Sequence, residues 1–150
     1  MPVENDAPAA QPSTLSRVDL SLAGAQQVLD AAIAAAGEIG VAVCVAVCDG
    51  GGNPLASARM DGAPVLSVQI AADKAWSVTS FGGLPTNSWW PLIEGQPALV
   101  HGITHTPRLV IFGGGEPVRV RGSLAGAVGV SGGSAEQDTA IAAAAAAAVG

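Results

Sequence analysis

This sequence has little charge, few aromatic rings and few cysteines. Its 150 residues include six Lys and Arg, twelve Asp and Glu, two histidines, two cysteines, three tryptophans and no tyrosine. Charged residues make up 12% of the chain, where about 25% is usual in globular proteins. No basic cluster is present and the net charge is −6, so nucleic acid is excluded as an expected partner.

Long apolar runs are also missing. The Ala-rich tail, 140–149, is too short to span a bilayer, so no membrane partner is expected. The N-terminus lacks the basic and apolar regions of a secretory signal, which favours a cytoplasmic protein with reduced thiols. Cys44 and Cys48 lie in an apolar run where a strand would turn both thiols to one face. They are interpreted as small buried hydrophobic residues, and no metal site is predicted.

The composition predicts one folded domain that assembles with copies of itself. Residues 1–19 are rich in Pro, Ala and Ser without periodicity, which indicates a disordered arm. Residues 20–150 are long enough to bury a core. A monomer with so few charges would expose much apolar surface, so a homo-oligomer is expected.

Periodicity and turn signals predict an α+β sandwich with a five-stranded antiparallel sheet flanked by helices. Hairpin-like spacing dominates, and the strand–helix alternation of a parallel doubly wound sheet is missing. Residues 95–107 are expected to be irregular. The helices are predicted at 22–39, 64–80, near 86–92 and 134–149, and the strands at 41–48, 54–60, 109–112, 118–120 and 124–130.

The stretch from Gly126 to Asp138 carries the strongest local signal of a site. An apolar strand breaks at Gly132 and Gly133 and opens a helix that Ser134 and Gln137 can cap with a capping box. Glycines allow close approach of backbone N–H groups, and the helix start favours anionic groups. Glu136 and Asp138, in the first helical turn, are explained by the helix dipole or by a role in the site.

Several other polar side chains are candidate site residues, and each also has a plainer structural interpretation. Lys74, the only lysine, is either on a solvated helix face or held partly dry, where it would face an acidic partner or bind an anion. Arg59 and Asp61 are either a carboxylate clamp or a surface ion pair. His101 and His105 could bind a haem iron or act as a base, although Gly102 makes a helix there unfavourable. Trp89 and Trp90 are either packing residues or walls for a flat ligand.

Several short motifs occur in a fixed order along the chain. They are Arg59-Met60-Asp61-Gly62-Ala63, Lys74-Ala75, Phe81-Gly82 with Pro85-Thr86, Gly113-Gly114-Gly115-Glu116-Pro117 and 126–133 with Glu136-Gln137-Asp138. Taken together, these motifs resemble the GlcG/HbpS-like family. The resemblance spans about residues 20–149.

The resemblance implies a profilin-like α+β fold, homo-oligomers that are often octamers, and haem as the cofactor of some members. Haem-binding members use histidines near the first helix, and this chain has none there, so that ligand is not carried over. The polar set that is carried over is Arg59, Asp61, Lys74, Glu136 and Asp138.

Two functions follow as hypotheses. The first is a small-ligand-binding protein, with haem or a similar flat cofactor bound through His101 or His105. The second is a cofactor-independent isomerase, lyase or hydratase acting on a small acid or carbonyl compound, with Lys74, a histidine and Glu136 as catalytic groups. Both place one pocket among Arg59, Asp61, Lys74, the segment 101–105, Gly132, Gly133 and Glu136.

Overall fold

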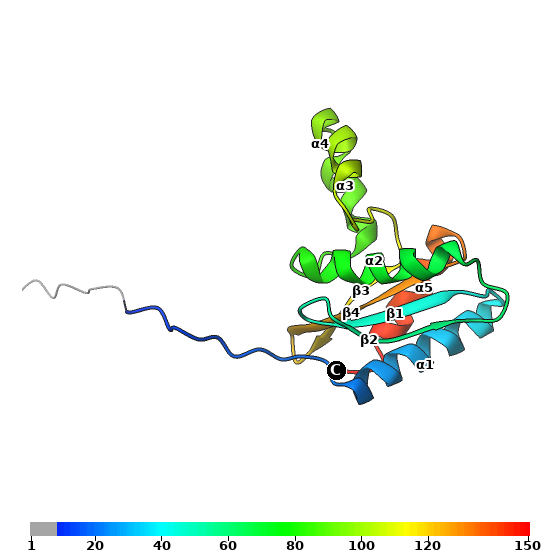
Figure 1. The fold of residues 1–150 in the computed structure, drawn as a ribbon, viewed down its shortest axis with the longest axis horizontal. Helices are drawn as coiled ribbons and strands as arrows, with labels where there is room; N and C mark the ends of the chain where they lie inside the picture. The colour runs from blue at the N-terminus through cyan, green and yellow to red at the C-terminus, as the bar shows by residue number, and fades with distance from the viewer. Residues whose placement is uncertain (1–8) are drawn as a thin grey trace, which may run out of the picture.

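Four antiparallel strands form the centre of the molecule, which is described for residues 9–150 by a computed structural model. The strands are β1 (Cys44–Asp49), β2 (Pro54–Arg59), β3 (Gly115–Val120) and β4 (Ser123–Ser131), in the order β2-β1-β4-β3 (Figure 1). The α+β class and the hairpin between β1 and β2 are confirmed. The prediction of five strands is wrong.

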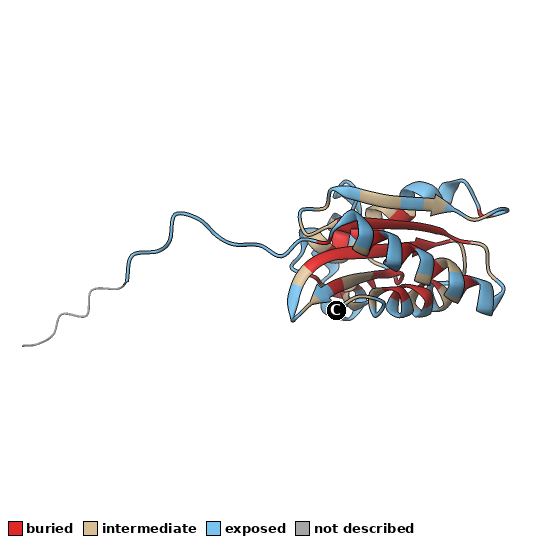
Figure 2. Cartoon of the chain, turned by 90° about the horizontal axis from the view of Figure 1, so that it is seen from below, coloured by how far each residue is buried: buried red, intermediate tan, exposed pale blue. Residues whose placement is uncertain are grey.

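Helices cover both faces of this sheet. α1 (Leu22–Ile39) and α5 (Ala135–Ala146) lie on one face, and α2 (Leu66–Ser80) lies on the other (Figure 1). The main core lies between the sheet and the pair α1 and α5, where inward side chains of alternating strand residues such as Val45, Val47 and Val128 are fully buried. The buried residues accordingly run along the strands, and exposed residues face outward on the helices (Figure 2).

The helix boundaries follow local capping signals. Ser21 accepts a hydrogen bond from the Gly24 N–H. Gly40 caps the C-terminus of α1, and its φ of 81° is the left-handed conformation that glycine adopts without strain. Ser134 and Gln137 form the predicted capping box at the start of α5. These contacts involve neighbours in sequence, which is why the sequence predicted these helix starts well.

The predicted strand at 109–112 does not form. The Val110 N–H donates to Ser77 Oγ at 2.9 Å, and the same hydroxyl donates to the Arg108 carbonyl oxygen. The Ser77 side chain of α2 therefore supplies hydrogen bonds that a neighbouring strand would otherwise have supplied to this backbone. The segment is a loop pinned to α2 rather than a fifth strand.

A helical arm replaces the irregular segment expected at 95–107. It consists of two 3-10 turns, η1 (Thr86–Ser88) and η2 (Ile103–His105), and two short helices, α3 (Trp89–Ile93) and α4 (Pro97–Gly102). We call residues 86–105 the α3–α4 arm. It projects beyond α2, away from the sheet (Figure 1). Pro97 at the first helical position favours α4, and Gly102 is its last residue rather than an interruption.

The segment before α1 is extended. Residues 9–19 form no helix or strand, and the Leu20 N–H donates to the Ala125 carbonyl oxygen of β4 at 2.9 Å. The disordered arm was predicted for residues 1–19, and its first part, residues 1–8, lies outside the described part of the chain. From residue 9 to residue 150, no helix combines the length and apolar character needed to cross a bilayer.

Candidate functional site

A groove opens between α2 and the β1–β2 hairpin. α2 packs mainly on β4 and β1 and contacts the edge strand β2 little, so part of the sheet face stays uncovered. The resulting cavity has a volume of about 450 Å³, within the usual range for small-molecule sites. We call it the hairpin groove. Its floor includes Cys44, Ala46, Cys48 and Ser57, and its wall on α2 includes Val68, Gln69, Ala72 and Ala75.

Two of the six basic side chains of the chain line this groove. Arg59 is the register partner of Cys44, and it donates to the Ala63 carbonyl oxygen at 3.1 Å. Arg108 donates to Asp73 Oδ1 at 2.9 Å and lies over the Trp76 ring, 4.9 Å from its centroid. Its φ of 65° is unusual for a residue with a side chain, and such conformations cluster at functional sites.

The two arginines lie toward opposite ends of the groove. Arg59 lies beside Cys44, and the charge of Arg108 acts on Cys48. Three strand residues lie between the two cysteines, and the four residue steps from Cys44 to Cys48 correspond to about 13 Å along β1. A largely apolar cavity with a guanidinium group at each end suits a flat apolar ligand that carries an anionic edge.

Both thiols point into this face of the sheet, as the sequence predicted. Cys44 and Cys48 are buried and free. Burial raises the pKa of each thiol, and the nearby charges of Arg59 and Arg108 oppose the rise at Cys44 and Cys48 respectively. The thiols therefore stay protonated near neutral pH unless a ligand displaces the proton.

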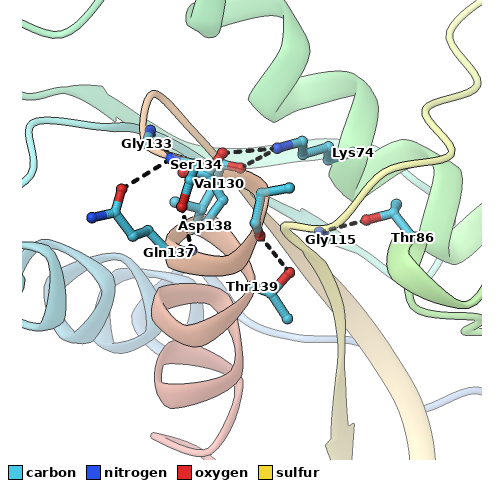
Figure 3. A network of polar contacts seen from close by, with 10 residues as sticks. Lys74, Thr86, Gly115, Val130, Gly133, Ser134, Gln137, Asp138 and Thr139 are labelled. Atoms are coloured by element: carbon cyan, nitrogen blue, oxygen red, sulfur yellow. Dashed lines mark hydrogen bonds and ion pairs between the residues drawn. The ribbon is translucent and has the colours of Figure 1, made fainter.

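Lys74 forms a buried polar centre and does not line the groove. Its Nζ donates to the Val130 carbonyl oxygen at 2.7 Å and to Asp138 Oδ2 at 3.2 Å, and the other Asp138 oxygen accepts from the Gly133 N–H (Figure 3). The Phe112 ring centroid lies 5.1 Å from Nζ. Burial lowers the pKa of the Lys74 ammonium, and the Asp138 carboxylate opposes that shift.

Lys74 thus lies on the buried side of α2, and the interpretation as a solvated helix face is wrong. Its partner is Asp138, the acidic residue at the start of α5. The arrangement ties α2, β4 and α5 together at the point where the two glycines turn the chain. Gly132 has a φ of 138°, and a Cβ there would lie 2.8 Å from the Ala42 carbonyl oxygen.

The family model described as "Haem degrading protein HbpS-like" matches residues 20–147. This chain belongs to the HbpS-like family. The expected membership of the GlcG/HbpS-like group is thereby confirmed.

Relatives of this HbpS-like chain agree in size and fold. An uncharacterized 15.0 kDa protein of the dhaT–dhaS intergenic region of Citrobacter freundii is 40% identical over 79% of this chain and 84% of its own length. A solved PduOC–haem complex is 34% identical, with a TM-score of 0.80, over 88% of this chain and 96% of that one.

The corrinoid adenosyltransferase PduO of Salmonella typhimurium is a further relative, 34% identical over 88% of this chain. The matched region is only 39% of the length of PduO. This chain therefore spans less than half of PduO, and the activity in that name is not carried over to it.

The remaining predicted residues of the HbpS-like chain are dispersed. His101, on α4, and His105, on η2, are exposed and line neither the hairpin groove nor a second hollow of about 420 Å³ at α5. Glu136 lines that second hollow, and Asp61 is exposed in a turn. Trp89 packs against Phe81 with centroids 4.7 Å apart, while Trp90 is half exposed.

Within one chain, therefore, the predicted single pocket is brought together only in part: Lys74 and Gly133 both contact Asp138, and the other residues lie apart. Arg59 stands on the edge strand, Lys74 points inward to α5, and the histidines are carried away on the α3–α4 arm. Sequence reasoning missed Arg108 and gave the cysteines no binding role. The available signal was scarcity: Arg108 is one of only six basic residues.

Proposed function

We propose that this protein binds haem in the hairpin groove. One observation carries the proposal: a largely apolar cavity lined by two of the six basic side chains of a charge-poor chain. The porphyrin ring is flat and apolar, and its propionates are carboxylates, which pair well with guanidinium groups. The relationship to the protein of the PduOC–haem complex supports the choice of ligand.

Arg59 is proposed to hold the propionates. Among the described residues, Arg108 already pairs with Asp73, whereas no carboxylate lies within ion-pair distance of Arg59. The small side chains of Ala46 and Ala72 leave room for the ring between sheet and helix. Bound haem would supply an iron centre, and the chain would supply orientation and partial exclusion of water.

Titration of the purified protein with haem tests this proposal. A saturable shift of the Soret band is expected, and Arg59→Gln should weaken binding by about tenfold or more, because a charge-assisted hydrogen bond is lost. Arg121→Gln, in the β3–β4 turn, removes the same charge outside the groove and should bind normally. Ala72→Phe should block binding by filling the cavity.

The proposal fails if no saturable shift is seen. It also fails if Arg59→Gln and Arg121→Gln weaken binding equally, since that would indicate a general effect of net charge. The enzyme alternative gains no support from the relatives. Its proposed catalytic groups also lie apart in the described chain, with Lys74 buried and both histidines exposed.

We also propose that the protein assembles as a homo-oligomer, with an octamer as the expected state. The α3–α4 arm carries Trp90, Leu92 and Leu99, all at least 40% exposed, on a projection with little core of its own. Covering such side chains between copies would stabilise the assembly.

Light scattering after size-exclusion chromatography should show the oligomer, and Trp90→Asp should dissociate it or shift it to smaller species. Leu15→Asp is the matched control, because Leu15 is 85% exposed on the extended segment before α1 and should have no effect. A wild-type protein that stays monomeric at micromolar concentration would contradict the proposal.

A further inference from the structure

Few side chains of the hairpin groove are of a kind that binds haem iron. The N and S side chains that commonly do so are His, Cys and Met. Both histidines are exposed on the α3–α4 arm, outside the groove, and Met60 packs against the main core on the opposite face of the sheet. Of these residue types, the described groove is lined only by Cys44 and Cys48.

The two thiols of the groove do not suit an iron ligand. Cys44 and Cys48 are 2% and 4% exposed. Sγ of Cys44 lies 3.8 Å from the Pro64 carbonyl oxygen. Sγ of Cys48 lies 4.0 Å from Thr79 Oγ1, beneath α2. Burial raises the pKa of both thiols, whereas the thiolate is the form that binds metals. The groove therefore does not fit a ring that must bond to it through a central iron.

The unpaired positive charge of the groove is confined to one end. Arg59 is exposed at the end of β2, and no carboxylate of the described residues lies within ion-pair distance of it. At the other end, Arg108 pairs with Asp73 Oδ1, which also accepts from Gln69 Nε2 at 2.9 Å. The Trp76 ring lies against the same Arg108 guanidinium group. Arg59 is therefore the basic group of the groove that is free to bind an anion.

The surface between the two ends is apolar. It includes Ala46 on the sheet and Val68 and Ala72 on α2, and Val68 is half exposed. Such a surface binds a flat ring through the apolar area that is buried, whatever atom stands at the centre of the ring. A guanidinium group binds a carboxylate at the edge of that ring through paired hydrogen bonds.

From this lining we infer that the hairpin groove binds tetrapyrroles by their apolar face and their carboxylate edge, without a bond to a central metal. Metal-free porphyrins are then ligands of the same groove. The inference rests on the proposed binding of haem there, and it adds that the groove recognises the ring and not the iron.

Parallel titrations with ferric haem and with metal-free protoporphyrin IX test the inference. The absorption of haem and the fluorescence of protoporphyrin IX should give dissociation constants within about threefold of each other. Arg59→Gln should weaken the binding of both by about tenfold, and Arg121→Gln, outside the groove, should weaken neither. Ala72→Phe, which fills the cavity, should block both, because one site serves both rings.

The dimethyl ester of protoporphyrin IX separates the contribution of the carboxylates in the unaltered protein. Because esterification removes the charge that Arg59 binds, the ester should bind the wild type about tenfold more weakly than the acid. Arg59→Gln should cause no further loss with the ester. An ester that binds as tightly as the acid would overturn the role given to the carboxylate edge.

Electron paramagnetic resonance of the ferric haem complex tests the iron directly. It should show neither a thiolate nor an imidazole signature, and the double variant His101→Ala, His105→Ala should bind both rings like the wild type. Either signature, or haem binding at least about tenfold tighter than that of protoporphyrin IX, would overturn the inference and leave haem binding intact. Failure of both rings to bind would overturn the proposed function as well.

Discussion

A single methyl group at Gly129 is expected to destabilise the protein by about 3 kcal/mol or more, enough to prevent folding if stability is modest. Gly129 lies in β4 directly beneath α2. A Cβ there would overlap the Ala71 carbonyl oxygen and lie 2.8 Å from the Ala75 nitrogen. These are backbone atoms of a helix, so no side chain can rotate away and α2 as a whole would have to move.

Gly37→Ala provides the matched control for this effect. Gly37 is exposed in α1, and a Cβ there would meet nothing within 4 Å. The same added methyl should stabilise the protein by about 0.5–1 kcal/mol, because alanine favours helix over glycine. Urea unfolding of Gly129→Ala, Gly37→Ala and wild type measures both effects. Similar unfolding free energies for the two variants would show that α2 is not held in close contact with β4.

Removal of the Lys74 charge is expected to have the second large effect. Lys74→Met should lower the free energy of unfolding by about 3–5 kcal/mol, because a buried Asp138 carboxylate loses its counter-charge. The Val130 carbonyl oxygen also loses its donor. For a chain of this length, the melting temperature should fall by roughly 10 °C. Thermal and urea unfolding measure the loss.

Two further variants sharpen this result. Arg17→Met removes a cation from the Arg17–Asp19 pair, whose side chains are 58% and 48% exposed, and should cost less than about 1 kcal/mol. The double variant Lys74→Met, Asp138→Asn removes both buried charges while the amide oxygen can still accept from the Gly133 N–H, so part of the stability should return. Equal losses for Lys74→Met and Arg17→Met would contradict the role given to the buried pair.

The position of the Lys74 pair explains why the sequence alone did not predict it. Lys74 has alanine neighbours in its helix, and alanine occurs at both buried and exposed positions in this chain. The neighbours therefore do not indicate whether the lysine is buried. Its partner, Asp138, is 64 residues away. The sequence did predict that an ammonium among alanines would need an acidic partner or an anion, since leaving it unpaired is costly. Only the packing of α5 beside β4 decided which residue it was.

The hairpin groove likewise depends on tertiary structure. The register that sets Arg59 beside Cys44 follows from the hairpin, which the sequence predicted from its turn. The position of Arg108 at the same groove does not follow from the hairpin. It depends on the path of the chain after the α3–α4 arm and on the ion pair with Asp73, 35 residues earlier. Contacts over such separations leave no periodic signal in the sequence.

The sequence by itself determined where α1 and α5 begin and which four segments form strands, because caps, turns and apolar alternation act between near neighbours. The tertiary structure decided the rest. It made 109–112 a loop, because the Val110 N–H donates to the Ser77 hydroxyl of α2 instead of to a neighbouring strand. It built the α3–α4 arm, and by leaving β2 uncovered beside α2 it created the groove, since a cavity is defined by what long-range packing fails to fill.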